Sequence, residues 1–128
     1  MSAVVVDASA MAAVVFYEAE GQTVRDRLEG ARLFAPRLLA YEMANIAWKK
    51  ARRAPNNAAA IFGSLAVAFE REWDIAWRDA PAIDVALVAR ATGLSAYDAT
   101  YVWLAGSLGA DLVTLDERIA AATALIGA

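Results

Sequence analysis

The sequence predicts an α/β fold with a central parallel β-sheet and helices on both of its faces. Short apolar runs alternate with longer segments that are rich in Ala, a residue that favours helix. Gly, Pro or a charged residue bounds most of these segments, and strand–helix alternation of this kind is typical of parallel sheets. No repeat, low-complexity tail or Pro/Gly-rich linker interrupts the chain, so we expect a single domain over residues 1–128.

The expected elements follow from apolar patterning and from helix-ending residues. Strands are expected at residues 3–6, 32–35, 74–80 and 111–115. Helices are expected at residues 8–18, 20–29, 37–53, 57–71, 82–92, 96–108 and 117–125. Pro36 is expected to stop the second strand and Pro55 the third helix, whereas Val14 and Val15 weaken the prediction for the first helix.

The composition excludes several kinds of chemistry. The chain has no His and no Cys, which removes histidine acid–base catalysis, disulfides and thiolate zinc sites. The formal net charge of −3 excludes a wholly basic nucleic-acid binder. A hydrophobic content of 60% is high for a soluble domain and predicts that a partner covers part of the surface.

The N-terminal segment lacks the basic region of a signal peptide, because Asp7 follows the first apolar run directly. The longest stretch without charged residues lies between Arg53 and Glu70 and falls short of the roughly 20 apolar residues that span a bilayer. We therefore expect a cytoplasmic protein without a membrane segment.

Two aspartates directly follow predicted strands. Asp7 comes after residues 3–6, and Asp116 after residues 111–115. Ligands of parallel sheets bind beyond the carboxyl ends of the strands, so both carboxylates are expected at the same edge. Each also stands where a helix begins, so helix N-capping is an equally good interpretation of each one alone.

Two further acids lie on helix faces with apolar neighbours. Glu42 is in the middle of a helix, and three of the four residues one turn away from it are apolar. Asp98 shares a largely apolar face with Tyr101. A carboxylate in such surroundings is costly unless it is paired or bound to a cation. The alternatives are a buried ion pair for Glu42 and a capping box with Ser95 for Asp98.

Together the four acids suggest a cation site. Carboxylates that lie close together raise one another's pKa and need a positive charge between them. With oxygen ligands alone, the expected ion is hard, either Mg²⁺ or Mn²⁺.

Four stretches resemble the PIN-domain nucleases, and specifically the VapC-type toxins of VapBC toxin–antitoxin pairs. In chain order they are VVVDASA, PRLLAYEMANIAW, LSAYDATYVWLA and LVTLDER, which start at residues 4, 36, 94 and 112. Their order and the chain length match the family, whereas residues 54–92 carry no matching motif.

The resemblance implies a three-layer α/β/α fold and an Mg²⁺- or Mn²⁺-dependent endoribonuclease. The family's acidic site would map onto Asp7, Glu42, Asp98 and Asp116. Of these, the three aspartates would hold metal, and the glutamate would be a ligand or would orient the attacking water.

Three neighbouring positions would support this site. Ser9 and Thr114 match positions that assist the family's acids by hydrogen bonding, and Asn45 lies one turn from Glu42. The resemblance also implies a homodimer, neutralised by a VapB antitoxin whose C-terminal segment fills the active-site groove. Operator DNA would be bound chiefly through the antitoxin.

The only basic cluster consists of Lys49, Lys50, Arg52 and Arg53. It would contact RNA phosphates at the groove rim, or it would simply be a solvated helix end that complements the helix dipole. Two other functions remain open: a PIN-fold nuclease for RNA processing outside any toxin system, and a catalytically silent interaction or co-repressor module.

Overall fold

A computed structural model describes residues 1–127, with side chains through Leu125. Its four strands are β1 (Ala3–Val6), β2 (Arg32–Pro36), β3 (Ile75–Arg78) and β4 (Asp111–Val113). All neighbouring strands are parallel, and the order across the sheet is β3-β2-β1-β4. The predicted parallel sheet is therefore confirmed.

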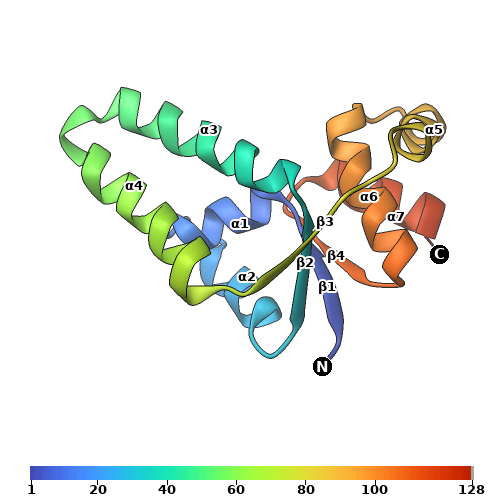
Figure 1. Cartoon of the computed structure of the whole chain (residues 1–128), viewed down its shortest axis with the longest axis horizontal. Coiled ribbons are helices and arrows are strands. Elements are labelled where there is room, and N and C mark those ends of the chain that lie inside the picture. The colour runs from blue at the N-terminus through green and yellow to red at the C-terminus, as the bar shows by residue number, and fades with distance from the viewer. Residues whose placement is uncertain (128) are drawn as a thin grey trace.

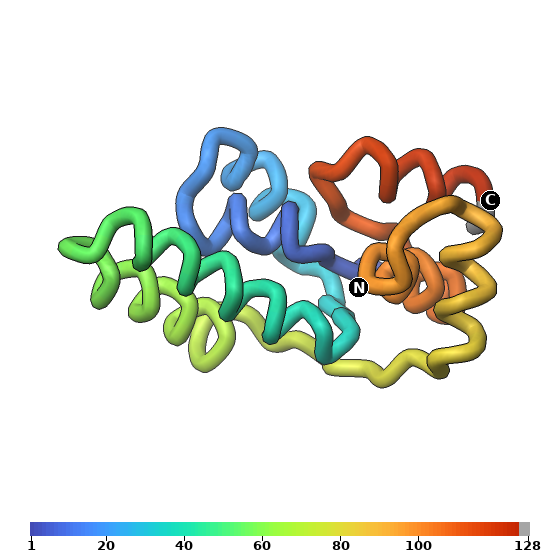
Figure 2. The backbone as a smooth tube through the Cα atoms, turned by 90° about the horizontal axis from the view of Figure 1, so that it is seen from above, coloured from blue at the N-terminus to red at the C-terminus, as the bar shows by residue number. Residues whose placement is uncertain are grey.

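The helices cover both faces of this sheet and make a three-layer structure. They are α1 (Ala8–Val15), α2 (Gly21–Leu28), α3 (Leu38–Arg53), α4 (Ala58–Val67), α5 (Ala82–Thr92), α6 (Ala96–Leu108) and α7 (Glu117–Gly127). Figure 1 shows α1 to α4 on one side of the strands and α5 to α7 on the other, and Figure 2 shows the same division from above.

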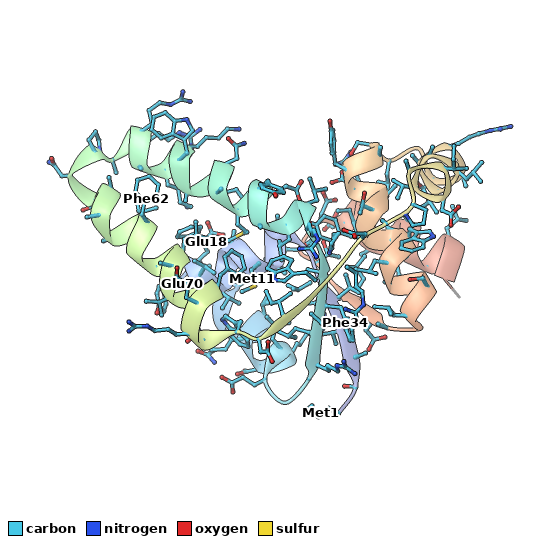
Figure 3. All side chains as sticks on the ribbon, in the orientation of Figure 1. Met1, Met11, Glu18, Phe34, Phe62 and Glu70 are labelled. Atoms are coloured by element: carbon cyan, nitrogen blue, oxygen red, sulfur yellow. The ribbon has the colours of Figure 1, made fainter. Side chains whose placement is uncertain are left out.

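The core forms where the central strand meets both helical layers. Val5 and Val6 of β1 are completely buried, as a strand with helices on both faces requires. Met11 of α1 and Phe34 of β2 extend this core, and Figure 3 shows both side chains in the interior beside the sheet. Phe62, by contrast, lies on the arm formed by α3 and α4 and is 45% exposed.

The strand order creates a topological switch point between β1 and β4. The chain proceeds from β1 to β2 to β3, then returns across the other face to add β4 beside β1. The register pairs Val6 with Val113, and the backbone N–H of Asp7 donates to the Val113 carbonyl over 3.2 Å. In open α/β sheets, ligands bind at such a switch point beyond the strand ends.

The first helix is shorter than predicted. It ends at Val15 rather than at residue 18, and Tyr17 follows with a φ of 54°. The Glu18 N–H donates back to the Ala13 carbonyl over 2.9 Å and closes the helix, and a Cβ on Gly21 would lie 2.3 Å from the same carbonyl oxygen. Only glycine lets α2 begin against the last turns of α1.

The predicted helix at residues 57–71 is divided into three parts. A 3₁₀ turn (Pro55–Asn57, η1) precedes α4, and a π turn (Ala68–Glu72, η2) follows it. The π turn closes with the Trp73 N–H donating to the Ala68 carbonyl. β2 includes Pro36 as its last residue, and β3 and β4 are shorter than predicted.

Among residues 1–127, no helix has the length and apolar character needed to cross a membrane.

Candidate active site

Asp7 lies at the carboxyl end of β1 with only 2% of its surface exposed. Its Oδ1 accepts hydrogen bonds from the Ala10 N–H (3.0 Å) and from the Ser9 hydroxyl (2.8 Å). Its Oδ2 accepts a short hydrogen bond from the Thr114 hydroxyl. Asp7 is thus the N-cap of α1, as one interpretation held, and at the same time the most buried carboxylate at this sheet edge.

The hydroxyl groups of Ser9 and Thr114 join the ends of β1 and β4. Besides donating to Asp7, Ser9 Oγ accepts from the Leu115 N–H over 2.9 Å, and Thr114 Oγ1 accepts from the Asp116 N–H over 3.0 Å. The two hydroxyl oxygens lie 3.4 Å apart. They therefore hold the segment that carries Asp116 beside Asp7.

Glu42 comes from the first half of α3 and is half-buried. The hydroxyl of Tyr101, on α6, donates a short hydrogen bond to Glu42 Oε1. Tyr101 is only 1% exposed, so its position is set by packing. This contact joins the helical layers on opposite faces of the sheet.

Asp98 and Asp116 lie at the starts of α6 and α7. Ser95 caps α6 by accepting from the Asp98 N–H, which confirms the predicted capping contact from this serine. Asp116 Oδ1 accepts from the N–H groups of Arg118 (2.8 Å) and Ile119 (3.4 Å), which is N-cap geometry. The Arg118 guanidinium lies 3.6 Å from Asp98 Oδ2 and 3.4 Å from Asp116 Oδ2.

The electrostatics show that the four acids influence one another. Burial raises the pKa of Asp7; its three hydrogen bonds oppose this, and the charge of Asp116 adds to it. Burial also raises the pKa of Glu42; the Tyr101 hydroxyl opposes this, and the charges of Asp98 and Asp7 add to it. Burial and the neighbouring Glu42 raise the pKa of the Tyr101 phenol, which keeps it a hydrogen-bond donor.

The pKa of Asp116 is shifted in the opposite direction, below its ordinary value. Desolvation is the largest single influence and raises its pKa, but the hydrogen bonds from Arg118 and Ile119 and the Arg118 charge together lower it. The edge therefore has a buried half, where the pKa values of Asp7 and Glu42 are raised, and an outer half with a positive partner.

The donor set suits a hard divalent cation. In the part of the chain that the structure describes, no three acidic side chains are arranged to hold a metal ion as they stand. Burial is the main cause of the raised pKa values of Asp7 and Glu42, and the charges of neighbouring acids add to it; a cation among these oxygens would oppose both effects. Asp7, Asp98 and Asp116 are the residues that could bind it.

The predicted basic cluster lies away from the acids. It occupies the end of α3, and Arg53 is about 16 Å along the helix axis from Glu42. Within it, Lys50 pairs with Glu18 over 3.2 Å, and the Arg52 guanidinium lies over the Trp48 ring. Asn45 is exposed on the same helix.

The sequence patterns assign no role to two residues of this edge, Tyr101 and Arg118. Tyr101 shares the helix face of Asp98, and a buried phenol on an apolar helix face needs a polar partner. Arg118 ends the LVTLDER stretch; an arginine in the first turn of a helix is unfavourable for the helix dipole and is therefore a signal of nearby acids.

Comparison with known proteins identifies the family. The model of the PIN domain matches residues 4–125. Ribonuclease VapC3 from Pyrobaculum aerophilum is 36% identical over 124 residues, covering 91% of each chain. The crystal structure of PAE2754 from Pyrobaculum aerophilum superposes with a TM-score of 0.79 at 32% identity, over 99% of this chain and 87% of the other.

The chain therefore belongs to the PIN-domain family, and it is of the VapC type.

Proposed function

We propose that this protein is an Mg²⁺- or Mn²⁺-dependent endoribonuclease that acts as the toxin of a VapBC toxin–antitoxin pair. The observation that supports this most is the meeting of four carboxylates from separate segments at one sheet edge, in a chain without His or Cys. The relative named Ribonuclease VapC3 supports RNA as the substrate.

In this proposal Asp7, Asp98 and Asp116 hold the ion. When bound, the ion polarises the scissile phosphate and makes a water molecule more acidic. Asp7 contributes an oriented carboxylate, because Ser9, Thr114 and the Ala10 N–H hold both of its oxygens. No histidine is needed for this chemistry.

Glu42 orients the attacking water and receives its proton. Tyr101 bonds to Oε1 and so directs the carboxylate, which leaves Oε2 as the oxygen that takes the proton. The raised pKa of Glu42 makes it a stronger base than an ordinary glutamate, as proton abstraction near neutral pH requires.

The partners in this proposal are RNA, a VapB-type antitoxin and a second copy of the chain, with operator DNA bound only through the antitoxin. Exposed apolar side chains offer surface for the two protein contacts. Those that are more than half exposed on the helices include Tyr41 and Trp48 of α3, Ile83 and Leu87 of α5, Tyr97 of α6 and Leu125 of α7. Of the basic cluster, Lys49, Arg52 and Arg53 are exposed and would contact RNA phosphates outside the acidic site.

The test is cleavage of a mixed RNA substrate of tRNA and structured rRNA fragments. Wild type, Asp7→Asn and Asp26→Asn are compared with Mg²⁺, Mn²⁺ or EDTA, after thermal melts have shown that all are folded. Asp26 is an exposed aspartate of α2 and serves as the control. We expect metal-dependent cleavage that Asp7→Asn lowers by more than about 100-fold.

If wild type and Asp7→Asn behave alike with or without metal, the nuclease proposal is wrong, and a silent interaction module is the better explanation. If the metal-dependent cleavage is present but co-expression with the product of an adjacent small gene leaves it unchanged, the toxin–antitoxin assignment is wrong and RNA processing takes its place.

A further inference from the structure

Arg118 is the one positive charge that contacts the candidate acids within the described residues. Its Nη2 lies 3.6 Å from Asp98 Oδ2 and 3.4 Å from Asp116 Oδ2, so a single guanidinium bridges two carboxylates from different helices. Its own backbone N–H donates to the other oxygen of Asp116 over 2.8 Å. The backbone of Arg118 is thus held by Asp116, and its side chain lies between the carboxylates of Asp98 and Asp116.

Helix stability does not explain this placement. Arg118 is in the first turn of α7, where the helix dipole presents partial positive charge and disfavours a cation. The side chain of Arg118 is 72% exposed, so little apolar packing holds it there. The attraction of Asp98 and Asp116 is what offsets the unfavourable position.

The ion pairs that Arg118 makes with Asp98 and Asp116 are weak. Ion pairs at such exposure contribute little free energy, because water screens them and two side chains must be held in one geometry. A divalent ion carries twice the charge of a guanidinium and is a better partner for the same oxygens. Because one Arg118 nitrogen lies within 3.6 Å of both carboxylates, a cation that binds these two oxygens competes with the guanidinium for them.

We propose that Arg118 is an exchangeable internal counterion of the acidic site, which a divalent metal displaces and which then binds a phosphate of the RNA. The inference rests on the proposed metal-dependent nuclease. A guanidinium suits the second role because it is always charged and its planar donors match two phosphate oxygens. Anchored by the backbone of α7, the displaced side chain stays at the rim where the RNA must pass.

The two roles predict opposite effects of one substitution. Arg118→Gln removes the competitor, so Mn²⁺ should bind about 2- to 10-fold more tightly than to wild type. The same variant loses its phosphate contact, so RNA cleavage at saturating Mn²⁺ should be slower by about tenfold or more. A purely structural role for Arg118 would not tighten metal binding.

The experiment titrates Mn²⁺ into the full chain by calorimetry, without RNA, and then measures cleavage at saturating Mn²⁺. Arg118→Lys keeps the charge and should bind Mn²⁺ like wild type, but it should cleave more slowly because an ammonium cannot make the paired contact. Arg27→Gln makes the same change of net charge on α2; Arg27 lines the same cavity as Asp111, at the opposite end of the sheet, and this variant should match wild type in both assays.

Equal Mn²⁺ affinity of wild type and Arg118→Gln would overturn the counterion role, and equal cleavage rates would overturn the phosphate contact. Both results leave the nuclease proposal intact. If wild type neither binds Mn²⁺ nor cleaves RNA, the proposed function itself fails and takes this inference with it.

Discussion

The two halves of the acidic edge are held by different kinds of partner. Asp7 and Glu42 are satisfied by neutral hydroxyl groups, and burial raises their pKa values. Asp98 and Asp116 share the positive charge of Arg118, and the pKa of Asp116 is lowered.

The two kinds of partner do different things: hydroxyl groups orient a carboxylate, whereas a guanidinium neutralises its charge. Hydroxyl donors fix the direction of a carboxylate but leave its charge uncompensated, which is costly where the carboxylate is buried or partly buried. A guanidinium at the surface compensates charge but is loosely held. We infer that the buried half is preorganised and that the outer half exchanges its counterion, and four predictions test this contrast.

The largest effect on RNA cleavage is expected from removing the Thr114 hydroxyl, which links Asp7 in the buried half to Asp116 in the outer half. Thr114→Val keeps the shape of the side chain but removes the hydroxyl that donates to Asp7 and accepts from the Asp116 N–H. Cleavage should fall by about 10- to 100-fold, as is usual when the support of a metal ligand is lost. Rates at saturating Mn²⁺ measure it, with Thr123→Val as control, because the Thr123 hydroxyl bonds only within α7. A Thr114→Val rate within twofold of wild type would contradict the preorganised half.

The next effect comes from the phenol that orients Glu42. Tyr101→Phe removes a hydrogen bond that lowers the pKa of Glu42, so this pKa should rise further. Because the proton acceptor must be ionised, the acid limb of the pH–rate profile should move to higher pH. The rate on that limb should fall by about tenfold.

Tyr97→Phe alters an exposed tyrosine of the same helix and is the matched control for this experiment. If the pH profiles of Tyr101→Phe and wild type coincide, Glu42 is not the group that takes the proton.

A smaller effect is expected on the free energy of unfolding. It should have opposite signs for Asp7→Asn in the buried half and Asp116→Asn in the outer half. Burial raises the folded-state pKa of Asp7 above its ordinary value of 3.8. Ionised Asp7 therefore lowers the free energy of unfolding near neutral pH. Asp7→Asn should therefore stabilise the metal-free protein by about 1 kcal/mol at pH 7. The gain should fade as the pH drops through the folded-state pKa toward 3.8.

For Asp116 the folded-state pKa is lowered, so its ionised form stabilises the fold above the unfolded-state pKa. Asn also caps helices well, so Asp116→Asn should lose only the charge contribution, a few tenths of a kcal/mol at pH 7. Urea denaturation in EDTA at pH 7 and pH 4 measures both variants. Destabilisation by Asp7→Asn at pH 7 would show that its hydrogen bonds outweigh the burial of its charge.

The smallest effect is expected far from the acids, in the basic cluster. Replacing Lys49, Arg52 and Arg53 together by Gln should raise KM a few-fold, leave kcat nearly unchanged and weaken the salt dependence of RNA binding. Lys50→Gln is the control, because Lys50 is already paired with Glu18. An unchanged KM with an unchanged salt slope would mean that this cluster is only a solvated helix end.

Much of the architecture was predictable because it depends on local patterns. The apolar run before Asp7, the glycines that end α2, α5 and α6, and the strand–helix alternation each require only neighbouring residues. The early end of α1 was not predictable, because the left-handed residue that follows it is Tyr17 and not a glycine. The π turn at Ala68–Glu72 was not predictable either, because no Gly or Pro in that segment marks a change from the regular helix.

Local patterns in the sequence specify which carboxylates follow strands, and parallel strands bring Asp7 and Asp116 to one edge. How those carboxylates are held depends on contacts between residues that are far apart in the chain. Tyr101 bonds to Glu42 across 59 residues and Thr114 bonds to Asp7 across 107, and these contacts depend on the strand order and on how α3 and α6 pack. Likewise, Arg118 bridges two acids only because α6 and α7 begin side by side, and no pattern within either helix specifies that.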